Sequence, residues 1–220
     1  MSGNGRAVAM LVVCAAAARA GEVIDCIAVT VGRTIITRSA ILEQARITAF
    51  LNREPADLSA ANVRRTAGRL IDVTLIRREM EIARYAAVDE AEVEKMLARL
   101  RAGRNAVKPE DFSKALDGYS LDEAALRRYL ILQNQTLRFV ELRFRPGSSV
   151  SDGEVELFYR DHFAPEFLRT NPAKTPPDLD DVRDRIEASL LEQRVDQSMD
   201  QWLKETRSQT RVMFFEETCR

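Results

Sequence analysis

Residues 24–37 read IDCIAVTVGRTIIT, and this stretch decides how the fold begins. It is dominated by β-branched residues and is interrupted by Gly32-Arg33, a pattern that predicts a β-hairpin. A second β-prone run, RVMFF, lies near the other end of the chain at residues 211–215. Because an isolated two-stranded hairpin is only marginally stable, we expect the two ends of the chain to meet in one small sheet.

Residues 1–20 have the features of a secretory signal peptide. Arg6 precedes an apolar and small-residue run at residues 7–18, which is shorter than the roughly 20 residues needed to span a bilayer. The sequence Ala18-Arg19-Ala20 suits a signal peptidase, so we expect cleavage after Ala20 and a mature protein in the periplasm. The alternative interpretation is a buried N-terminal helix. A lipid anchor at Cys14 is disfavoured because it requires a small preceding residue.

Composition restricts the class of protein. The chain has 220 residues, 9 Gly and 7 Pro, and 45% of its residues are hydrophobic, which excludes collagen-like, disordered and multispan membrane proteins. Loss of residues 1–20 removes two arginines and no acid, so the net charge changes from -1 to -3. A mildly acidic protein has no general attraction for phosphate backbones, and we expect no nucleic-acid partner. After cleavage we also expect no stable membrane insertion.

Two cysteines remain in the predicted mature chain, Cys26 and Cys219. If the last strand runs antiparallel to the first, these residues come close enough for a disulfide, which requires Cα atoms within about 7 Å. Export to an oxidising compartment would permit the bond. Two unrelated thiols remain the alternative.

Between the β-prone ends, apolar residues recur at helical spacing. Caps and stops predict helices that begin after Thr37, near Ser59, at Asp89 (ending at Gly103), at Ser120 (ending before Pro146), at Ser151 and at Leu179. Ser120 with Glu123 and Ser151 with Glu154 have capping-box spacing. In the helix after Ser120 we expect a buried stripe of Leu126, Tyr129, Leu130 and Leu137. The predicted fold class is mainly α with a small sheet.

Common catalytic signatures are absent from the sequence. His162 is the only histidine and is expected in a loop, so we predict no catalytic histidine pair and no histidine metal site. No Walker motif or dinucleotide-binding G-x-G-x-x-G occurs, and neither does a G-x-S-x-G or C-x-x-C sequence. We therefore expect no catalytic residues, no cofactor and no metal, and we expect binding without reaction.

Four segments resemble the SurA and parvulin-associated chaperone family. They are IAVTVGRTIITRSAILEQA (27–45), RLIDVTLIRREMEIAR (69–84), VSDGEVELFYRDHF (150–163) and VRDRIEASLLEQRVDQSMDQWLKETRSQTRVMFF (182–215). In order, they are similar to the opening strands and helix, the second long helix, the segment after the N-terminal helices, and the closing helix with the last strand. The resemblance implies a SurA N-domain-like helical module. It predicts one domain at 21–220, made of residues 24–150, a short helix and Pro-rich loop at 151–180, and residues 181–215.

The chain departs from this family where a parvulin isomerase domain is usually inserted. Only residues 160–180 separate Tyr159 from Asp181, too few for such a domain, and they contain one histidine and no glycine. We therefore expect no prolyl isomerase activity, although an isomerase-like protein remains one alternative.

The resemblance implies an ATP-independent chaperone of the cell envelope. Its partners would be unfolded secreted or outer-membrane polypeptides, held in an apolar cradle between helices. Flexible Met and aromatic side chains adapt to many partners. We therefore expect seven partly exposed residues around the cradle: Phe50, Leu51, Met96, Phe112, Tyr129, Phe158 and Phe163. For each of them, burial in the core is the alternative. A dedicated assembly or scaffold factor for one envelope partner is the rival function.

Overall fold

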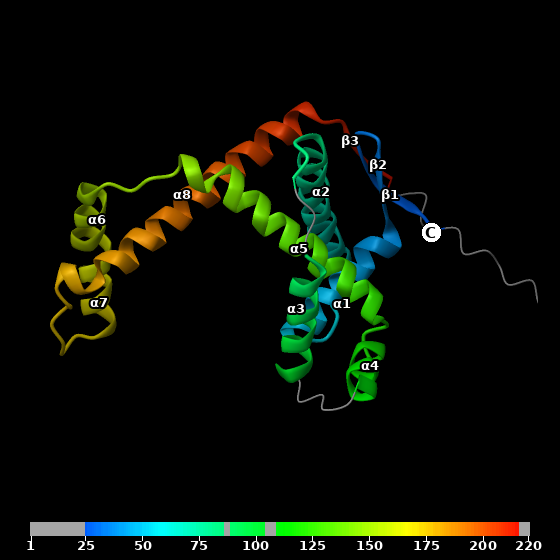
Figure 1. The fold of residues 1–220 in the computed structure, drawn as a ribbon, viewed down its shortest axis with the longest axis horizontal. Coiled ribbons are helices and arrows are strands. Elements are labelled where there is room, and N and C mark those ends of the chain that lie inside the picture. Colours follow the sequence, from blue (N-terminus) through cyan, green and yellow to red (C-terminus); the bar gives the residue numbers. More distant parts are fainter. Residues whose placement is uncertain (1–24, 86–88, 104–108, 216–220) are drawn as a thin grey trace, which may run out of the picture.

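The computed structural model describes residues 25–85, 89–103 and 109–215, which form helices and one small sheet (Figure 1). The elements follow the order β1 (Ile27–Val31), β2 (Thr34–Thr37), α1 (Arg38–Asn52), α2 (Ala60–Ile82), α3 (Glu90–Gly103), α4 (Pro109–Asp117), α5 (Glu123–Arg143), the 3-10 turn η1 (Arg145–Gly147), α6 (Asp152–Phe158), the π-helical turn η2 (Tyr159–Phe163), α7 (Ala164–Thr170), α8 (Leu179–Gln209) and β3 (Val212–Phe214). The predicted fold class is confirmed.

The sheet joins the two ends of the described chain in the order β2-β1-β3. Gly32 has a φ of 60°, a left-handed conformation that glycine adopts without strain, and it allows the tight turn between β1 and β2. β3 runs antiparallel to β1, with Val29 opposite Phe214 and Val31 opposite Val212. Both expectations for the strands are confirmed.

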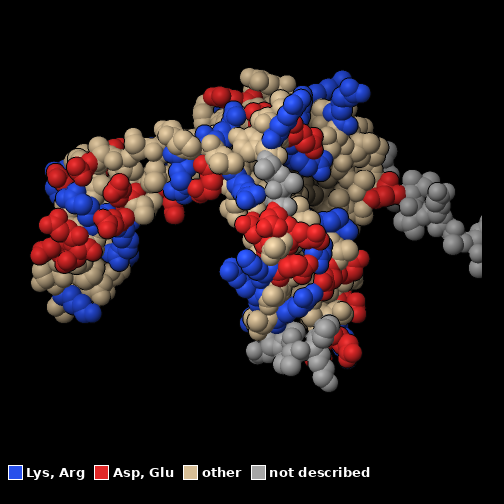
Figure 2. All heavy atoms as spheres, in the orientation of Figure 1, with Lys and Arg blue, Asp and Glu red and all other residues tan. Residues whose placement is uncertain are grey.

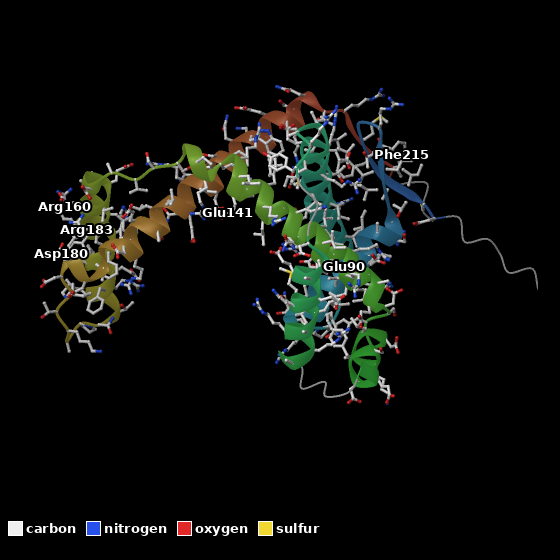
Figure 3. The ribbon with its side chains drawn as sticks, viewed as in Figure 1. Glu90, Glu141, Arg160, Asp180, Arg183 and Phe215 are labelled. Carbon is white, nitrogen blue, oxygen red and sulfur yellow. The ribbon has the colours of Figure 1, made fainter. Side chains whose placement is uncertain are left out.

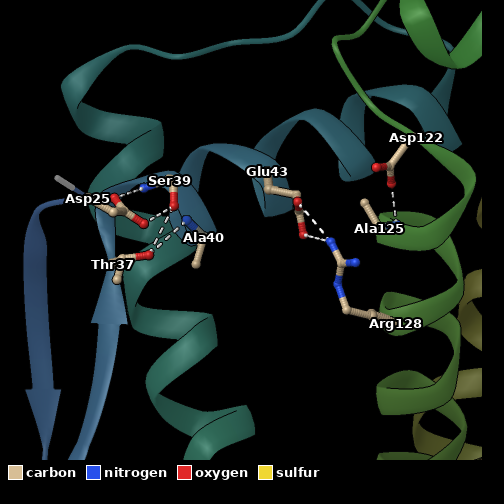
Figure 4. Close-up of polar contacts among 8 residues, drawn as sticks. All are labelled: Asp25, Thr37, Ser39, Ala40, Glu43, Asp122, Ala125 and Arg128. Carbon is tan, nitrogen blue, oxygen red and sulfur yellow. Dashed lines mark hydrogen bonds and ion pairs between the residues drawn. The ribbon is translucent and has the colours of Figure 1, made fainter. Parts of the chain in front are cut away.

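Local hydrogen bonds fix the passage from the sheet into α1 (Figure 4). The Thr37 side chain caps α1 by accepting a hydrogen bond from the Ala40 amide at 3.3 Å. Ser39 donates through both its hydroxyl and its amide to the carboxylate of Asp25. Hydrogen bonds from the side chains of Ser39 and Thr37 lower the pKa of Asp25. This network is the reason that α1 begins where the cap residue predicted.

Two apolar clusters hold the helices next to the sheet. Val29, Val31 and Ile36 of the sheet pack against Ile41 of α1 and against Ala67, Ile71 and Leu75 of α2. The larger cluster joins α1, α3, α4 and α5. On the surface, Arg128 of α5 reaches Glu43 of α1 at 3.2 Å (Figure 4). α1 is therefore shared by both clusters and connects the sheet to the helical limb below it.

α8 carries the chain from a distant group of helices back to the sheet (Figure 1). It has 31 residues, about 46 Å at 1.5 Å per residue. Near its C-terminal end it is fastened to α2, where Arg207 lies 2.7 Å from Asp72 and donates to the Gly68 carbonyl at 2.8 Å. Burial raises the pKa of Asp72, and Arg207 opposes that shift.

Two sequence expectations need correction, and two short helices, α4 and α7, were not predicted. α5 begins at Glu123 with Asp122 as its cap, because Ser120 has a φ of 54° in the preceding turn and cannot serve as the N-cap. His162 lies in the π-helical turn η2, not in a loop, because the chain continues from α6 into α7 as one helical path. In α4, Phe112 and Leu116 are buried.

Candidate peptide-binding surface

The described residues form an arch with two limbs. Figure 2 shows a broad hollow between the distal limb (α6, η2, α7 and the start of α8) and the proximal limb (α1, α3, α4 and the start of α5). The C-terminal part of α5 and the middle of α8 make the roof (Figure 1). This hollow is the largest concave feature of the face shown, and it separates two independently packed groups of helices.

An aromatic joint, made of Tyr85, Phe139, Phe144 and Trp202, holds the roof to α2. Phe139 is 0% exposed. Its ring centroid lies 5.1 Å from that of Trp202 and 5.6 Å from that of Phe144. The Arg143 guanidinium lies 5.5 Å from the Trp202 ring, a distance at which a cation and an aromatic face attract. The joint therefore sets the angle between α5 and α8.

The distal limb has a small core of its own. Val155 of α6 packs against Val182 and Ile186 of α8. The Tyr159 hydroxyl donates to the Pro177 carbonyl at 2.8 Å and so ties the Pro-rich loop to η2. Arg183 of α8 lies 3.3 Å from Asp152 of α6, which connects the two helices. It also lies 3.6 Å from Asp180, one turn earlier in α8 (Figure 3). The limb is thus fixed to the end of α8 by both apolar and ionic contacts.

A capping box sets where the distal limb begins. The Ser151 hydroxyl accepts from the Glu154 amide at 3.4 Å, and the Ser151 amide donates to the Glu154 carboxylate at 2.8 Å. Hydrogen bonds from the Ser151 amide and from Arg194 lower the pKa of Glu154 to about 2. Arg194 also donates to the Ser149 carbonyl, so the α8 side chain holds the linker and α6 together. The predicted capping box is confirmed.

An open hollow of about 660 Å³ lies on the distal limb and is called the distal hollow here. Its apolar wall is made of Phe158, Phe163, Pro165 and Phe167. The Phe163 and Phe167 rings are stacked with centroids 6.3 Å apart, and Arg185 covers Phe163 at 5.2 Å. Its charged lining residues are Asp161, Glu166 and Arg169. An aromatic wall with charges of both signs at its border can accept an apolar side chain of an extended peptide.

The seven predicted binding residues divide between the two limbs. Phe158 and Phe163 are partly buried and line the distal hollow. The expectation of partial exposure is wrong for Phe50 and Phe112, which are both 0% exposed in the core of the proximal limb. The remaining three are partly buried against that same core: Leu51, Met96 and Tyr129. Burial raises the pKa of the Tyr129 phenol.

The physical reason for this division is edge-to-face aromatic packing. The Phe50 ring lies 6.0 Å from Phe112 and 5.5 Å from Tyr119, both nearly perpendicular to it. Such pairs add stabilisation beyond the area they bury. Phe50 and Phe112 thus stabilise the limb and do not reach the hollow between the limbs.

Several exposed apolar side chains were missed as surface candidates. Leu137 was expected in the buried stripe of α5, but its side chain is 59% exposed. At this point of α5 it is the Phe139 side chain that packs inward, in the aromatic joint. Other large apolar side chains are exposed on α5 (Leu142), the distal limb (Leu157, Leu168) and the sheet (Ile35, Phe214). Leu137 lies seven residues after Leu130, on the same face of the helix, so apolar spacing alone could not indicate that it is exposed, whereas Leu142 lies on the opposite side of the helix.

Charged side chains of both signs cover the limbs, so the hollow between them is more polar than the predicted apolar cradle (Figure 2). Arg101 lies 2.6 Å from Glu123, and Arg127 pairs with Glu94, which joins α3 to α5. Exposed ion pairs contribute little to stability. Apolar contact area is therefore concentrated in the distal hollow and in single exposed side chains.

Cys26 is disulfide-bonded. Its predicted partner, Cys219, lies outside the described residues, as does the predicted signal peptide at 1–20. The Phe215 amide donates to the Ala28 carbonyl at 2.9 Å. Ala28 is two residues after Cys26 in the sequence, and Phe215 is four residues before Cys219. The Cys26–Cys219 pairing stays a prediction.

No family model and no curated protein matches the chain. Across residues 25–85, 89–103 and 109–215, none of the helices is both long and apolar enough to cross a bilayer. The same ranges contain no cluster of three or more His, Cys, Asp or Glu side chains that could hold a metal ion.

Proposed function

We propose that this protein is an ATP-independent chaperone of the cell envelope, which holds unfolded secreted or outer-membrane polypeptides under the arch. Two observations carry the proposal: the broad hollow between the two limbs (Figure 2) and the aromatic wall of the distal hollow. An unfolded client exposes apolar side chains, and burying them contributes about 25 cal/mol per Å² before the cost of ordering is subtracted. The distal hollow offers such burial without closing around the client.

The arrangement favours weak and general binding. The Phe158, Phe163 and Phe167 side chains accept apolar groups of different shapes, while the charged groups beside them pair with each other in exposed ion pairs such as Arg169–Glu166. Such pairs exchange partners at little cost. A client with mixed apolar and charged residues can therefore bind in more than one register, which suits a chaperone better than a receptor for one ligand.

The aromatic joint gives the arch a defined span. Because Phe139 is buried between α2, α5 and α8, the distal limb is held away from the proximal limb. A long client can thus contact both limbs, and two weak contacts on one chain give a higher effective affinity than either alone.

The test is suppression of aggregation of unrelated, chemically unfolded proteins by the purified chain lacking residues 1–20, without ATP. Phe167→Ala removes one ring from the distal hollow and is expected to weaken the protection. The matched control is Leu168→Ala, the next residue of α7, which is exposed and does not line the hollow. Circular dichroism confirms that both variants are folded.

Three results contradict the proposal. Failure of the unmodified protein to protect any unrelated client removes the chaperone function. Tight, saturable binding to one envelope protein without general protection supports a dedicated assembly factor. Acceleration of prolyl isomerisation in a peptide assay supports the isomerase alternative.

A further inference from the structure

The free edge of β2 presents a backbone donor and acceptor that the sheet does not use. Gly32 donates to the Arg211 carbonyl and Phe215 donates to the Ala28 carbonyl, so alternate residues of β1, including Thr30, direct their backbone groups towards β3. Ile35 is opposite Thr30 in the β1·β2 pair. That pair is therefore not hydrogen-bonded, and the N–H and C=O of Ile35 face away from β1.

The β2 strand is short, with four residues, but its edge otherwise lacks the usual protection against pairing with another chain. Edge strands are commonly guarded by charged residues, proline or a covering element. β2 reads Thr-Ile-Ile-Thr and contains none of these residues, and the Ile35 side chain is 53% exposed. The strand thus has both the hydrogen-bonding groups and the apolar surface to accept another strand.

A hollow of about 140 Å³ lies beside the same edge. Its lining comes from Ile35 and Ile36 of β2 and from helices beneath the sheet, including Leu70, Val73 and Arg77 of α2 and Leu132 of α5. A cavity of about 150 Å³ with apolar walls accepts a benzene ring in another protein. One aliphatic side chain of an added strand therefore fits here, on the face that points to α2.

Basic side chains gather at the turn end of the edge. Arg77 lines the hollow, and the Arg78 guanidinium lies 3.6 Å from the position a Cβ would take on Gly32. Arg33 is exposed in the turn itself. Within the described ranges neither Arg33 nor Arg78 has an ion pair, so an acidic residue of a bound chain would find a partner here.

We propose that the free edge of β2 binds an extended client segment as a fourth strand of the sheet. The segment alternates apolar and polar residues, places one aliphatic side chain in the hollow, and carries an acidic residue towards the arginines of the turn. This inference rests on the proposed chaperone function, since it assigns to clients a second contact remote from the distal hollow. Backbone pairing reads no particular sequence, which suits a binder of many unfolded chains.

A second copy of this chain is a poorer occupant. Its own β2 is flanked by Arg33 and Arg38 and contains no acid. Antiparallel pairing centred on Ile35 would place Arg33 of one copy opposite Thr37, next to Arg38 of the other. Parallel pairing would place the two Arg33 side chains together. Either register adds positive charge to the basic end of the edge.

The direct test is binding of a fluorescent peptide of alternating Thr and Val that ends in Glu, measured by polarisation against the purified chain. The comparison peptide carries N-methyl groups on alternate amides, which removes donors and blocks strand pairing but keeps the side chains. We expect at least a fivefold weaker affinity for the methylated peptide, equivalent to about 1 kcal/mol and to one net hydrogen bond. Equal affinities for the two peptides would overturn the proposal.

Two substitutions at Ile35 test whether the peptide binds to the edge of β2. Ile35→Pro removes the outward N–H without removing a bond of the β1·β2 ladder, and proline is tolerated at such positions; we expect an affinity loss of about fivefold or more. Ile35→Thr keeps the backbone donor and the β preference, and we expect less than about a twofold change. Hydrogen exchange of the Ile35 amide in the unmodified protein, which requires no variant, should slow only with the unmethylated peptide.

The outcomes separate this inference from the chaperone function. If the protein suppresses aggregation but the peptide binds independently of N-methylation, the edge proposal fails and the chaperone function stands. If the peptide binds through the edge of β2 but no client is protected from aggregation, the chaperone function fails and the edge proposal stands. A dimer in solution that Ile35→Pro dissociates would identify a second copy as the occupant and overturn the proposal.

Discussion

Replacing Phe139 with alanine should weaken the protein far more than the neighbouring change Leu137→Ala. The Phe139 side chain is 0% exposed between α2, α5 and α8. An aromatic side chain buries about 150–250 Å², which at about 25 cal/mol per Å² corresponds to about 4–6 kcal/mol. Alanine retains part of that contact and gains up to about 0.7 kcal/mol in helix propensity, which leaves a loss of about 3–5 kcal/mol, as for other buried phenylalanines.

Leu137 provides a matched control on the same helix. It is two residues away from Phe139 and 59% exposed, so its truncation should change the free energy of unfolding by less than about 0.5 kcal/mol. Both variants are measured by urea unfolding, followed by circular dichroism and by the fluorescence of Trp202, the only tryptophan. Because Trp202 packs on Phe139, its emission should shift to longer wavelength in Phe139→Ala alone.

A difference of less than about 1 kcal/mol between the two variants would refute this account of the joint, since one truncates a side chain with no exposed surface and the other an exposed one. Small-angle X-ray scattering adds a second readout. We expect a broader distribution of molecular dimensions in Phe139→Ala, because the joint sets the angle between the limbs. An unchanged scattering profile together with a large loss of stability would mean that other contacts hold the arch.

Two further predictions concern the limb and the termini. The pKa of Glu154 in the folded protein is about 2, below its ordinary value of 4.5. The stabilisation that the ionised carboxylate provides is therefore fully present above about pH 4.5 and is lost as the pH falls towards 2. In urea unfolding, the unmodified protein should lose more stability between pH 5 and 2 than Glu154→Gln does, and parallel pH profiles for the two proteins would contradict this role. Oxidised, denatured protein lacking residues 1–20 should show no reactive thiol if Cys26 pairs with Cys219, and Cys26→Ser should expose one; two reactive thiols in the unmodified protein would exclude the bond.

Local signals predicted the elements that depend on neighbouring residues. Thr37 and Ser151 cap helices through bonds to amides three residues further on, so their positions follow from the sequence alone. Such signals fail where packing against segments distant in sequence fixes the backbone conformation. Ser120 has the right spacing for a capping box, but its left-handed conformation transfers the cap to Asp122.

The candidate surface was less predictable than the fold, because an apolar residue at helical spacing can face a core or the solvent. Phe50 and Phe158 have similar sequence contexts, yet one is enclosed by Phe112 and Tyr119 and the other lines the distal hollow. Leu137 and Phe139 differ in the same way on α5. Each assignment depends on which helix lies opposite, and that helix is far away in the chain.

By itself, the sequence determined that the chain would be mainly helical, that its ends would pair as strands, and where most helices begin, because propensity and capping act over a few residues. Only the tertiary structure decided that α5 belongs to two clusters, that α8 holds the distal limb away from the rest, and that the edge of β2 is left open. Those features arise from contacts between segments distant in sequence, whose free energies depend on shape and burial rather than on residue type alone.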